Sequence, residues 1–596
     1  MTGAEYVAEF LAQRKIENVF LLTGGACVFL VDAIGQHPTL DYKCFQHEQG
    51  AAMAADAVWR SCGKVGVTMA PSGPGATNLI TGIACNWFDS IPVMHITGQV
   101  NPRDSEVFKG SKVRQTGFQE TQIVELIKPI TKYAVQIRNG DELKRELTKA
   151  YNIAITGRMG PVLIDVPMNV QQEEVGDEIF YEPPQDEAPS TEILSALKIA
   201  TTDLFEGAER PLVLFGAGVG LSGAEERIAA WLERIGVPFV SSWSGCSYFD
   251  HRLLGYCGSI GVYGNRGANN ILQNCDALLV LGSRLDTRQR PGDPKLFAPA
   301  AKIHVVDVDV EELNKYTPQG YGVTELSMDK AVPVIETLEA PDISEAWQDY
   351  VGIQKEKYFD KDTSQFAKDH DTISPYEAIR QVNRLVNEDA TVLVDCGATT
   401  CWFFLSFLRK KHTIFSNGGC APISYALSAS IGAAFSQPGE RIFCFIGDGG
   451  FQNNIQELQT IVHYNLPVKL FVLNNNGYLT IKATQQNHFG RFVGAEKSSG
   501  VTCPDIIKIA TAYGLPNIRI ANTEELNLKI DSVLQATGPM VCEIIMEENQ
   551  PLIPRVSSLK KPDGTIISKP IEDLYPFLSR EEFQENMIVA PTEILK

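Results

Sequence analysis

Hydrophobic and polar residues follow one another along this chain in short blocks that predict strands and helices in turn. Short apolar runs such as 65–69 and 441–446 are typical of buried strands, whereas 451–458 has the spacing of a helix. The order strand, helix, strand recurs through most of the sequence. We therefore expect an α/β protein built on doubly wound parallel sheets.

Stretches rich in proline or charge interrupt this pattern at 171–189 and 355–370, and they are typical of linkers. We expect three doubly wound domains, at 1–178, 190–342 and 372–550, followed by a C-terminal tail at 551–596. A chain of 596 residues is too long for one core, so several domains are expected on length alone. The tail carries Pro576 and Phe583, and we expect it to pack on the body.

The first and third domains share the same order of predicted elements. In the first, a strand leads into the loop 72–78, a helix, and a strand that opens at Pro92. In the third, a strand leads into 447–450, a helix, and a strand that opens at Pro467. This repeat predicts two related domains that bind two ends of one ligand.

Polar residues in the third domain stand where two successive strands end. Asp448 lies in Gly447-Asp448-Gly449, and Asn475 ends the following strand. The carboxyl edge of an open α/β sheet is where ligands bind. Carboxylate and amide oxygens suit Mg²⁺, and glycines let the backbone approach a phosphate. A Gly-Asp-Gly alone is usually a turn, but the asparagine at the next strand end favours a site for a metal-bound phosphate.

Composition excludes several classes of protein. A formal net charge of −20 argues against nucleic acid and anionic membranes as partners. Thirteen cysteines without a Cys-x-x-Cys pair indicate reduced, mostly buried thiols rather than disulfides or a zinc site. Because neither a signal peptide nor a long apolar run is visible, we expect a cytoplasmic protein.

The metal motif and its setting resemble the thiamine-diphosphate-dependent enzymes over most of the chain. The resemblance implies a pyrimidine-binding first domain, an FAD-type middle domain and a diphosphate-binding third domain. It also implies that Mg²⁺ is held by the side chains of Asp448 and Asn475 and the carbonyl of Gly477. The metal would in turn hold the diphosphate of the cofactor.

Glu48 is the key residue of the first domain in this resemblance. It follows the strand that ends near Phe45 and opens the helical stretch 49–55. A glutamate there is commonly no more than a favourable partner of the helix dipole. In the family, a glutamate in this setting binds the aminopyrimidine ring and shares a proton with it. The ring can then deprotonate the thiazolium carbon of the cofactor.

The acetolactate synthase branch of the family matches more closely, through 23–26, 72–78, 89–92, 98–100, 117–120, 130–132 and 418–425. In this branch Ile423 falls on the apolar residue that supports the bent cofactor. Phe118, Gln119 and Lys132 fall on residues that line the active-site entrance from the neighbouring subunit. The resemblance thus implies a homodimer or homotetramer with active sites at the dimer interface. It adds Gly25 to the catalytic residues and the following residues to the cofactor site: Asn78, Gly397, Ala398, Ala421, Gly447, Gly449 and Gly450.

The middle domain decides whether flavin is expected. A lone Gly-x-Gly after a strand is weak evidence for a dinucleotide, and a tight turn in a plain α/β domain is the alternative. The residues that resemble those of the FAD-binding members are Gly216, Gly218, Arg284, Arg288, Asp307 and Asp309. We therefore expect FAD, which is structural in the acetolactate synthases.

The acceptor pocket departs from the pattern of that branch. Ala483 and Thr484 stand where acetolactate synthases have Gln-Trp, so a large ring is lost and space opens. Arg288, a candidate for the acceptor carboxylate, is retained. The chain has no adjacent His pair, which disfavours a simple decarboxylase.

We expect decarboxylation of a 2-keto acid, pyruvate or similar, and carboligation to a second carbonyl. That acceptor is a second keto acid, a larger ketone or a keto-sugar nucleotide. The alternatives are an FAD-linked pyruvate oxidase and a non-catalytic regulatory protein on the same fold.

Overall fold

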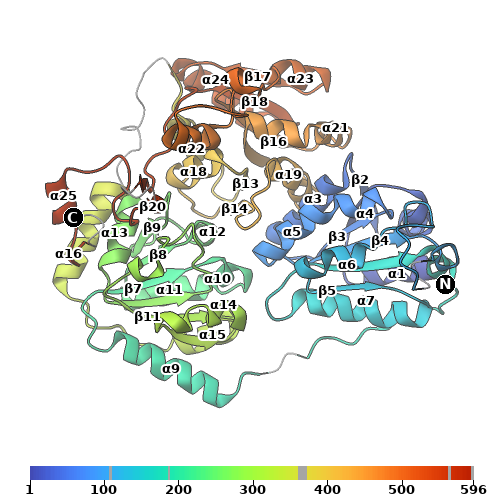
Figure 1. Cartoon of the computed structure of the whole chain (residues 1–596), viewed down its shortest axis with the longest axis horizontal. Helices are drawn as coiled ribbons and strands as arrows, with labels where there is room; N and C mark the ends of the chain where they lie inside the picture. Colours follow the sequence, from blue (N-terminus) through green and yellow to red (C-terminus); the bar gives the residue numbers. More distant parts are fainter. Residues whose placement is uncertain (107–109, 186–187, 360–371, 561–565, 592–596) are drawn as a thin grey trace. The chain divides into compact units, whose positions relative to one another are not determined.

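The computed structural model describes residues 1–106, 110–185, 188–359, 372–560 and 566–591. It contains three six-stranded sheets whose strands run parallel, together with one two-stranded sheet. Figure 1 labels the helices that flank these sheets. The expected α/β class with three parallel-sheet domains is thereby confirmed. The chain forms two compact units, Met1–Asp186 with Ala390–Thr399 and Phe415–Glu548, and Glu187–Asp389 with Thr400–Ile414 and Asn549–Lys596.

The first domain holds a sheet with the strand order β2-β1-β3-β4-β6-β5. Its strands are β1 (Asn18–Leu21), β2 (Asp41–Cys44), β3 (Gly66–Ala70), β4 (Val93–Gln99), β5 (Tyr133–Gln136) and β6 (Val162–Pro167). Its helices are α1 (Gly3–Gln13), α2 (Val28–Gln36), α3 (Glu48–Cys62), α4 (Pro74–Asn78), α5 (Ile80–Asp89), α6 (Ile123–Ile127), α7 (Gly140–Ile155) and α8 (Met168–Gln172).

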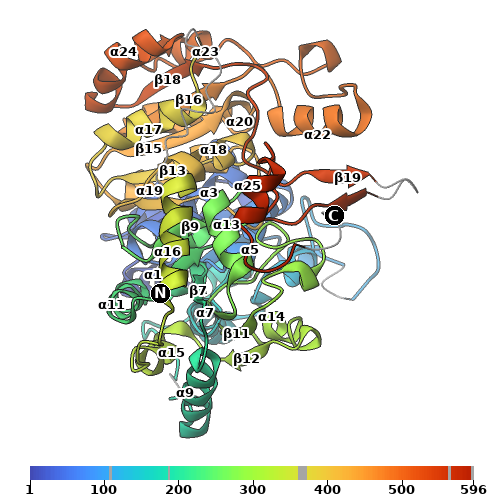
Figure 2. The same ribbon diagram turned by 90° about the vertical axis from the view of Figure 1, so that its left-hand side faces the viewer.

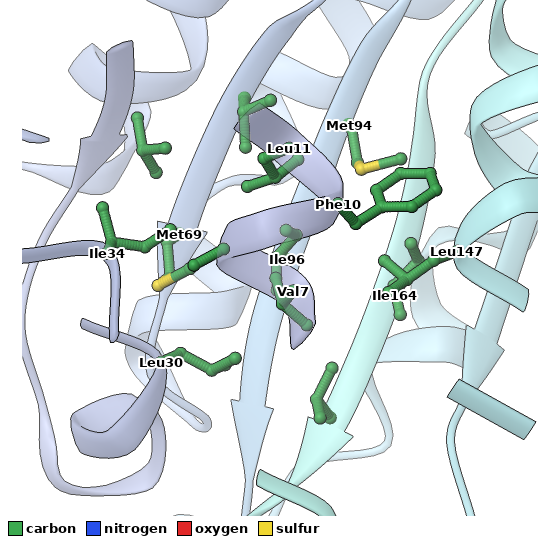
Figure 3. Close-up of a cluster of buried hydrophobic side chains, with 14 of the residues drawn as sticks. Val7, Phe10, Leu11, Leu30, Ile34, Met69, Met94, Ile96, Leu147 and Ile164 are labelled. Atoms are coloured by element: carbon green, nitrogen blue, oxygen red, sulfur yellow. The ribbon is translucent and has the colours of Figure 1, made fainter. Parts of the chain in front are cut away.

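Helix α1 shows how this domain is assembled from its sequence. Thr2 and Glu5 form a capping box that satisfies the free N–H groups at its start. Its apolar face then buries Val7, Phe10 and Leu11 in one cluster with residues of β4, β6, α2 and α7, as Figure 3 shows. Burial of this face anchors the sheet whose strand ends carry the candidate site.

The third domain repeats the topology of the first, with the strand order β14-β13-β15-β16-β18-β17. Its strands are β13 (Thr391–Val394), β14 (Thr413–Phe415), β15 (Ile442–Gly447), β16 (Val468–Asn474), β17 (Asn517–Ile520) and β18 (Met540–Ile545). Its helices are α17 (Pro375–Leu385), α18 (Ala398–Ser406), α19 (Tyr425–Ser436), α20 (Asp448–Asn453), α21 (Leu458–His463), α22 (Leu479–Phe489), α23 (Ile506–Ala512) and α24 (Thr523–Gln535).

Both orders reverse direction between the first and third strand of their domain, which is the switch point where open α/β sheets bind ligands. The repeated plan read from the sequence thus corresponds to a repeated topology. Helices α3 and α19 join the two domains at very close range. A Cβ added to Gly432 would lie 2.0 Å from the carbonyl oxygen of Ala54, so this contact requires glycine.

The middle domain has a different order, β12-β11-β10-β7-β8-β9. Read from the other edge this is the 3-2-1-4-5-6 order of dinucleotide-binding sheets. Its strands are β7 (Pro211–Phe215), β8 (Phe239–Ser241), β9 (Tyr256–Ser259), β10 (Ala277–Leu281), β11 (Lys302–Asp307) and β12 (Gly322–Glu325). Its helices are α9 (Thr191–Phe205), α10 (Ala217–Leu221), α11 (Glu225–Ile235), α12 (Trp243–Cys246), α13 (Arg266–Asn274), α14 (Val310–Asn314), α15 (Met328–Ile335) and α16 (Glu345–Gln354).

The C-terminal tail packs on the middle domain, where α13 and α16 lie side by side in Figures 1 and 2. It contains β19 (Ser558–Lys560), β20 (Ile566–Ser568) and α25 (Arg580–Glu585). The guanidinium of Arg266 donates to the carbonyl oxygens of Leu574 and Pro576, at 3.2 and 2.8 Å, and Phe583 is buried. Most of the expected linker 355–370 lies outside the described residues.

The cysteines and the apolar character of the helices are also described by the structure. All thirteen cysteines are free thiols, and Cys62 alone is exposed. In the part of the chain that the structure describes, none of the helices has the length and apolar character needed to cross a membrane.

Candidate active site

The candidate site in the third domain lies at the switch point between β13 and β15. Gly397 and Ala398 follow β13, and Gly447 ends β15 beside Thr399, whose hydroxyl would lie 3.6 Å from a Cβ added to Gly447. Gly397 has a φ of +79°, a value that favours glycine. The predicted cofactor residues of this domain are therefore brought together at one sheet edge.

Asp448 begins α20 at this edge and is almost completely buried, with 2% of its surface exposed. Its Oδ1 accepts from the N–H of Gly449 at 2.8 Å, and its Oδ2 accepts from the N–H of Gly477 at 2.9 Å. Burial raises the pKa of this carboxyl group. A cation close to the carboxylate would offset that cost of burying a charge.

Asn475 supplies the second predicted ligand just beyond β16. Its side chain is buried, and the terminal Nδ2 position has no hydrogen-bond partner. A buried amide N–H without an acceptor is costly, and a phosphate oxygen at this point would satisfy it, whereas a cation would bind the Oδ1 of the same side chain. The φ of +147° at Gly477 and the hydrogen bond from its N–H fix the loop that carries the third predicted ligand.

The donors at this point fit a hard divalent cation that shares its remaining ligands with a phosphate group. They comprise one carboxylate, one amide and one carbonyl. Among the residues that the structure describes, no cluster of three or more His, Cys, Asp or Glu side chains could hold a metal.

Glu48 occupies the matching edge of the first domain. It opens α3 just beyond β2, and it is buried. Its Oε2 accepts from the Nδ2 of Asn78 at 2.9 Å, and a Cβ added to Gly75 would lie 3.3 Å from its Oε1. The structure thus brings together Glu48 and Asn78, two predicted site residues that are 30 positions apart. Gly25 follows β1 at the same edge, and a Cβ there would meet no atom within 4 Å.

The segment expected at the active-site entrance lies beside the loop that precedes α4. A Cβ added to Gly73 would lie 2.8 Å from the Cβ of Gln119, and both residues have positive φ values. Phe118 is 84% exposed. An aromatic ring this exposed is available to contact another molecule.

Lys132 is engaged with the end of α7. Its ammonium group donates to the carbonyl oxygens of Ile153 and Thr156, the latter at 2.6 Å. Burial lowers its pKa to about 8. These contacts stabilise the C-terminus of a helix, where positive charge is favourable.

The loop 417–421, which precedes Ile423, is fixed by side chains that sequence reasoning missed. Asn417 donates to the carbonyl oxygen of Cys85 at 3.1 Å and accepts from the N–H groups of Cys420 and Ala421. Asp89 accepts from the N–H groups of Gly418 and Gly419 at 3.0 and 2.8 Å. The motif 89–92 contains Asp89, but nothing in that motif indicates that Asp89 contacts the loop 417–421.

Ile423 leaves this loop with 44% of its surface exposed, although it is a large apolar residue. Ser424 follows with a φ of +71°, and its N–H donates to the Oδ2 of Asp395 at 3.0 Å. Burial raises the pKa of Asp395 to about 7. Strained backbone held by a buried acid is typical of functional sites, and here it presents Ile423 outward.

A buried polar network packs against the loop 417–421. Asp56 accepts from Arg60 at 2.6 Å, from Asn86 at 2.8 Å and from the hydroxyl of Tyr425. Arg60 also pairs with Asp89 at 2.8 Å. Because a buried charge is stable only when it is paired, this network fixes the first domain against α19 of the third.

The predicted flavin residues lie at the strand ends of the middle sheet. Gly216 and Gly218 follow β7, and the N–H of Gly218 donates to the carbonyl oxygen of Gly282 at 3.0 Å. A Cβ added to Gly216 would lie 2.2 Å from that oxygen. Contact between two loops therefore accounts for the glycines without a bound ligand.

Several of the charged residues of this region make hydrogen bonds that involve nearby backbone groups. The carbonyl oxygen of Arg284 accepts from the ammonium group of Lys315 at 2.6 Å. Asp307 accepts from the N–H of Asp309 at 3.1 Å, and Asp309 caps α14. Arg288 has an exposed side chain. These groups surround the switch point between β7 and β10, where a dinucleotide would bind.

The positions that replace Gln-Trp lie on α22. Thr484 is exposed, and its hydroxyl donates to the carbonyl oxygen of Thr480 at 2.9 Å. Ala483 is half-buried on the same helix. Neither side chain fills the volume of an indole ring.

Comparisons with known proteins agree with this architecture. The chain matches the thiamine pyrophosphate enzyme domains, namely the N-terminal TPP binding domain at 1–126, the central domain at 200–326 and the C-terminal TPP binding domain at 395–544. TPP is another name for thiamine diphosphate.

Curated relatives match along nearly the whole chain. The acetolactate synthase isozyme 2 large subunit of Escherichia coli is 30% identical, covering 96% of this chain and 100% of the relative. A probable acetolactate synthase large subunit of Methanocaldococcus jannaschii is 31% identical, covering 98% of each. The acetolactate synthase large subunit of Corynebacterium glutamicum is 31% identical, covering 94% of this chain and 89% of the relative. The chain therefore belongs to the thiamine-diphosphate-dependent enzymes, in the acetolactate synthase branch, and is a carboligase of that type.

Proposed function

We propose that this enzyme decarboxylates pyruvate or a similar 2-keto acid, with Mg²⁺ as its metal, and joins the acyl unit to a second carbonyl compound. One observation carries the proposal. Buried Glu48 with its partner Asn78, and the buried Asp448–Asn475–Gly477 set, occupy the ligand-binding edges of two sheets with the same topology.

The residues have distinct roles in this proposal. Thiamine diphosphate, when bound, supplies the acyl-anion chemistry. Asp448, Asn475 and the carbonyl of Gly477 hold the cation that neutralises its diphosphate. Glu48 holds and moves one proton at its carboxyl group, and Asn78 fixes the carboxyl orientation through the 2.9 Å hydrogen bond. Ile423 supports the cofactor from its apolar side.

The assembly belongs to the proposal as well. We infer a homodimer or homotetramer in which Phe118, Gln119 and Lys132 line the active-site entrance of the neighbouring subunit. The exposure of Phe118 supports a role for this segment in an interface. Light scattering on the purified protein would test the inference, because a monomeric enzyme with full activity would contradict it.

The acceptor is proposed to be larger than pyruvate, including a keto-sugar nucleotide. Support comes from Ala483 and Thr484, which leave open the space that a Gln-Trp pair would fill. Arg288 is the candidate for an acceptor carboxylate. A screen of donor and acceptor pairs by mass spectrometry identifies the product. Formation of acetyl phosphate and peroxide instead of a new carbon–carbon bond would replace this proposal with the oxidase.

FAD is proposed as a second, structural cofactor of the middle domain. Support comes from its 3-2-1-4-5-6 strand order and from Arg284 and Asp307 at the adjoining strand ends. The purified protein should be yellow and should release FAD on denaturation. A colourless protein that cannot be reconstituted with FAD would contradict this, and the Gly216–Gly282 contact would then be a purely structural feature.

A further inference from the structure

Glu457 is a fully buried carboxylate that takes no part in the site described above. It lies in the turn between α20 and α21, with 0% of its surface exposed. The hydroxyl of Thr460 donates to its Oε2 at 2.7 Å. Its other contacts reach across to the first domain, where the chain approaches Glu48.

The carboxylate binds the backbone just before the catalytic glutamate. Its Oε1 accepts from the N–H of Gln46 at 3.2 Å, and its Oε2 lies 3.4 Å from the same nitrogen. The N–H of His47 also donates to it. Burial raises the pKa of Glu457 to about 7, and a carboxyl oxygen accepts these hydrogen bonds whether or not the group is ionised. Glu457 therefore fixes the two peptide units that lead into Glu48.

Gly50 allows this approach. A Cβ at Gly50 would lie 2.8 Å from the Oε1 of Glu457. Contacts closer than 3.0 Å are essentially absent for real Cβ atoms, so a larger residue would displace the carboxylate or the start of α3. The first turn of α3 is thus shaped to receive a side chain from the third domain.

Two neighbours of Glu457 bind the same segment. The N–H of Cys44 donates to the hydroxyl oxygen of Tyr464 at 3.0 Å. The side chain of Gln49 donates to the Oδ1 of Asn454 at 3.4 Å. Asn454 directly follows α20, the helix that begins with Asp448. One stretch of the third domain therefore holds 44–49 at three points.

We propose that Glu457 is a positioning residue that orients Glu48 for proton transfer, by holding the N–H groups of Gln46 and His47. This deepens the proposed function and rests on it. Misplacement of a catalytic group by about 1 Å can cost about 100-fold in rate. The contact can therefore affect the rate of catalysis, although Glu457 itself does not touch the cofactor.

The test compares three variants. E457A removes the acceptor of the Gln46 and His47 N–H groups. E457Q is the conservative rescue, because its Oε1 can accept from the backbone while its amide donates to the hydroxyl oxygen of Thr460. T460V is the matched control, since it removes one hydrogen bond to the same carboxylate without touching 46–50.

Two readouts are measured. The first is exchange of the cofactor's C2 proton in deuterated buffer, at saturating thiamine diphosphate and Mg²⁺. The second is deuterium uptake by the peptide 44–53 in the cofactor-free protein, which does not depend on activity. E457A should slow C2 exchange by about 10- to 100-fold and should raise uptake in 44–53. E457Q and T460V should stay within about threefold of wild type in rate, by the same argument from geometry.

If E457A does not fold, G50A carries the test, because alanine favours the helix while its Cβ displaces the carboxylate. It should also slow C2 exchange. Wild-type rates in both E457A and G50A would overturn the positioning role, as would an equal loss of rate in T460V. Failure of the wild type to bind or exchange thiamine diphosphate would overturn the proposed function together with this role. The two outcomes can be told apart. Normal C2 exchange in the wild type together with normal exchange in E457A would overturn the positioning role alone.

Discussion

Asp89 binds the loop 417–421 at three points and Arg60 at a fourth, and its replacement by asparagine should weaken cofactor binding. Its Oδ2 accepts from Arg60 at 2.8 Å, from Asn417 at 3.0 Å and from the N–H of Gly418 at 3.0 Å. Its Oδ1 accepts from the N–H of Gly419 at 2.8 Å. An asparagine keeps one oxygen and turns an amino group toward the remaining donors, so it loses the charge and at least one bond.

The magnitude follows from these contacts. A hydrogen bond to a charged group contributes about 1.5–3 kcal/mol. We therefore expect D89N to loosen the loop 417–421 by about 2–3 kcal/mol. If the cofactor must restore that order on binding, its affinity falls by about 30- to 150-fold. Donor turnover at saturating cofactor should fall much less, because the loop is then held in place.

The assay is titration of the cofactor-free protein with thiamine diphosphate at fixed Mg²⁺, followed by calorimetry. D573N is the matched control. Asp573 is a buried carboxylate with two cationic partners, Lys569 at 3.1 Å and Arg580 at 2.8 Å, in the other unit of the chain. D573N should lower thermal stability and leave the affinity unchanged. An affinity for D89N within about threefold of wild type, a gap of roughly 0.7 kcal/mol, would refute the reasoning.

Three further predictions follow from other parts of the site. D448A should not retain thiamine diphosphate at any practical Mg²⁺ level, whereas in the wild type chelation should release the cofactor and Mg²⁺ should restore it; tight binding to D448A would contradict the metal site. T484W should slow bulky acceptors by about one to two decades relative to pyruvate, with donor decarboxylation unchanged, and competition between acceptors measures this. Cys420, whose pKa the hydrogen bond from Cys85 lowers to about 7, should reach its full alkylation rate just above neutral pH. Cys85, whose pKa burial raises, should stay unmodified, and mass spectrometry of the alkylated peptides reads both.

Sequence could predict the parts of the site that depend on local signals. Asp448 and Asn475 each stand at the end of an apolar strand, Glu48 follows the short strand β2, and these patterns are visible within a few residues. The three-domain α/β plan follows from the same periodicity. The repeated plan of the first and third domains follows from two short loops, and the shared strand order agrees with it.

Long-range contacts could not be predicted in this way. Asp89 meets Asn417 across 328 positions, and Glu457 meets Gln46 across 411 positions. No periodicity or motif connects such pairs, because their meeting depends on how α3 and α19 pack. Similarly, Gly216 matched a dinucleotide motif in sequence, whereas its contact with Gly282 shows that tight loop packing alone requires glycine there.

The central claim is that Glu48 controls a proton of bound thiamine diphosphate, and proton exchange at the C2 carbon of the cofactor tests it most directly. Glu48→Gln keeps an oxygen for the 2.9 Å contact with Asn78, so fold and cofactor binding should persist. The wild type should exchange the C2 proton rapidly in deuterated buffer, and the variant should be slower by about 10²- to 10⁴-fold. Equal exchange rates in the two proteins, with thiamine diphosphate bound to both, would contradict the account.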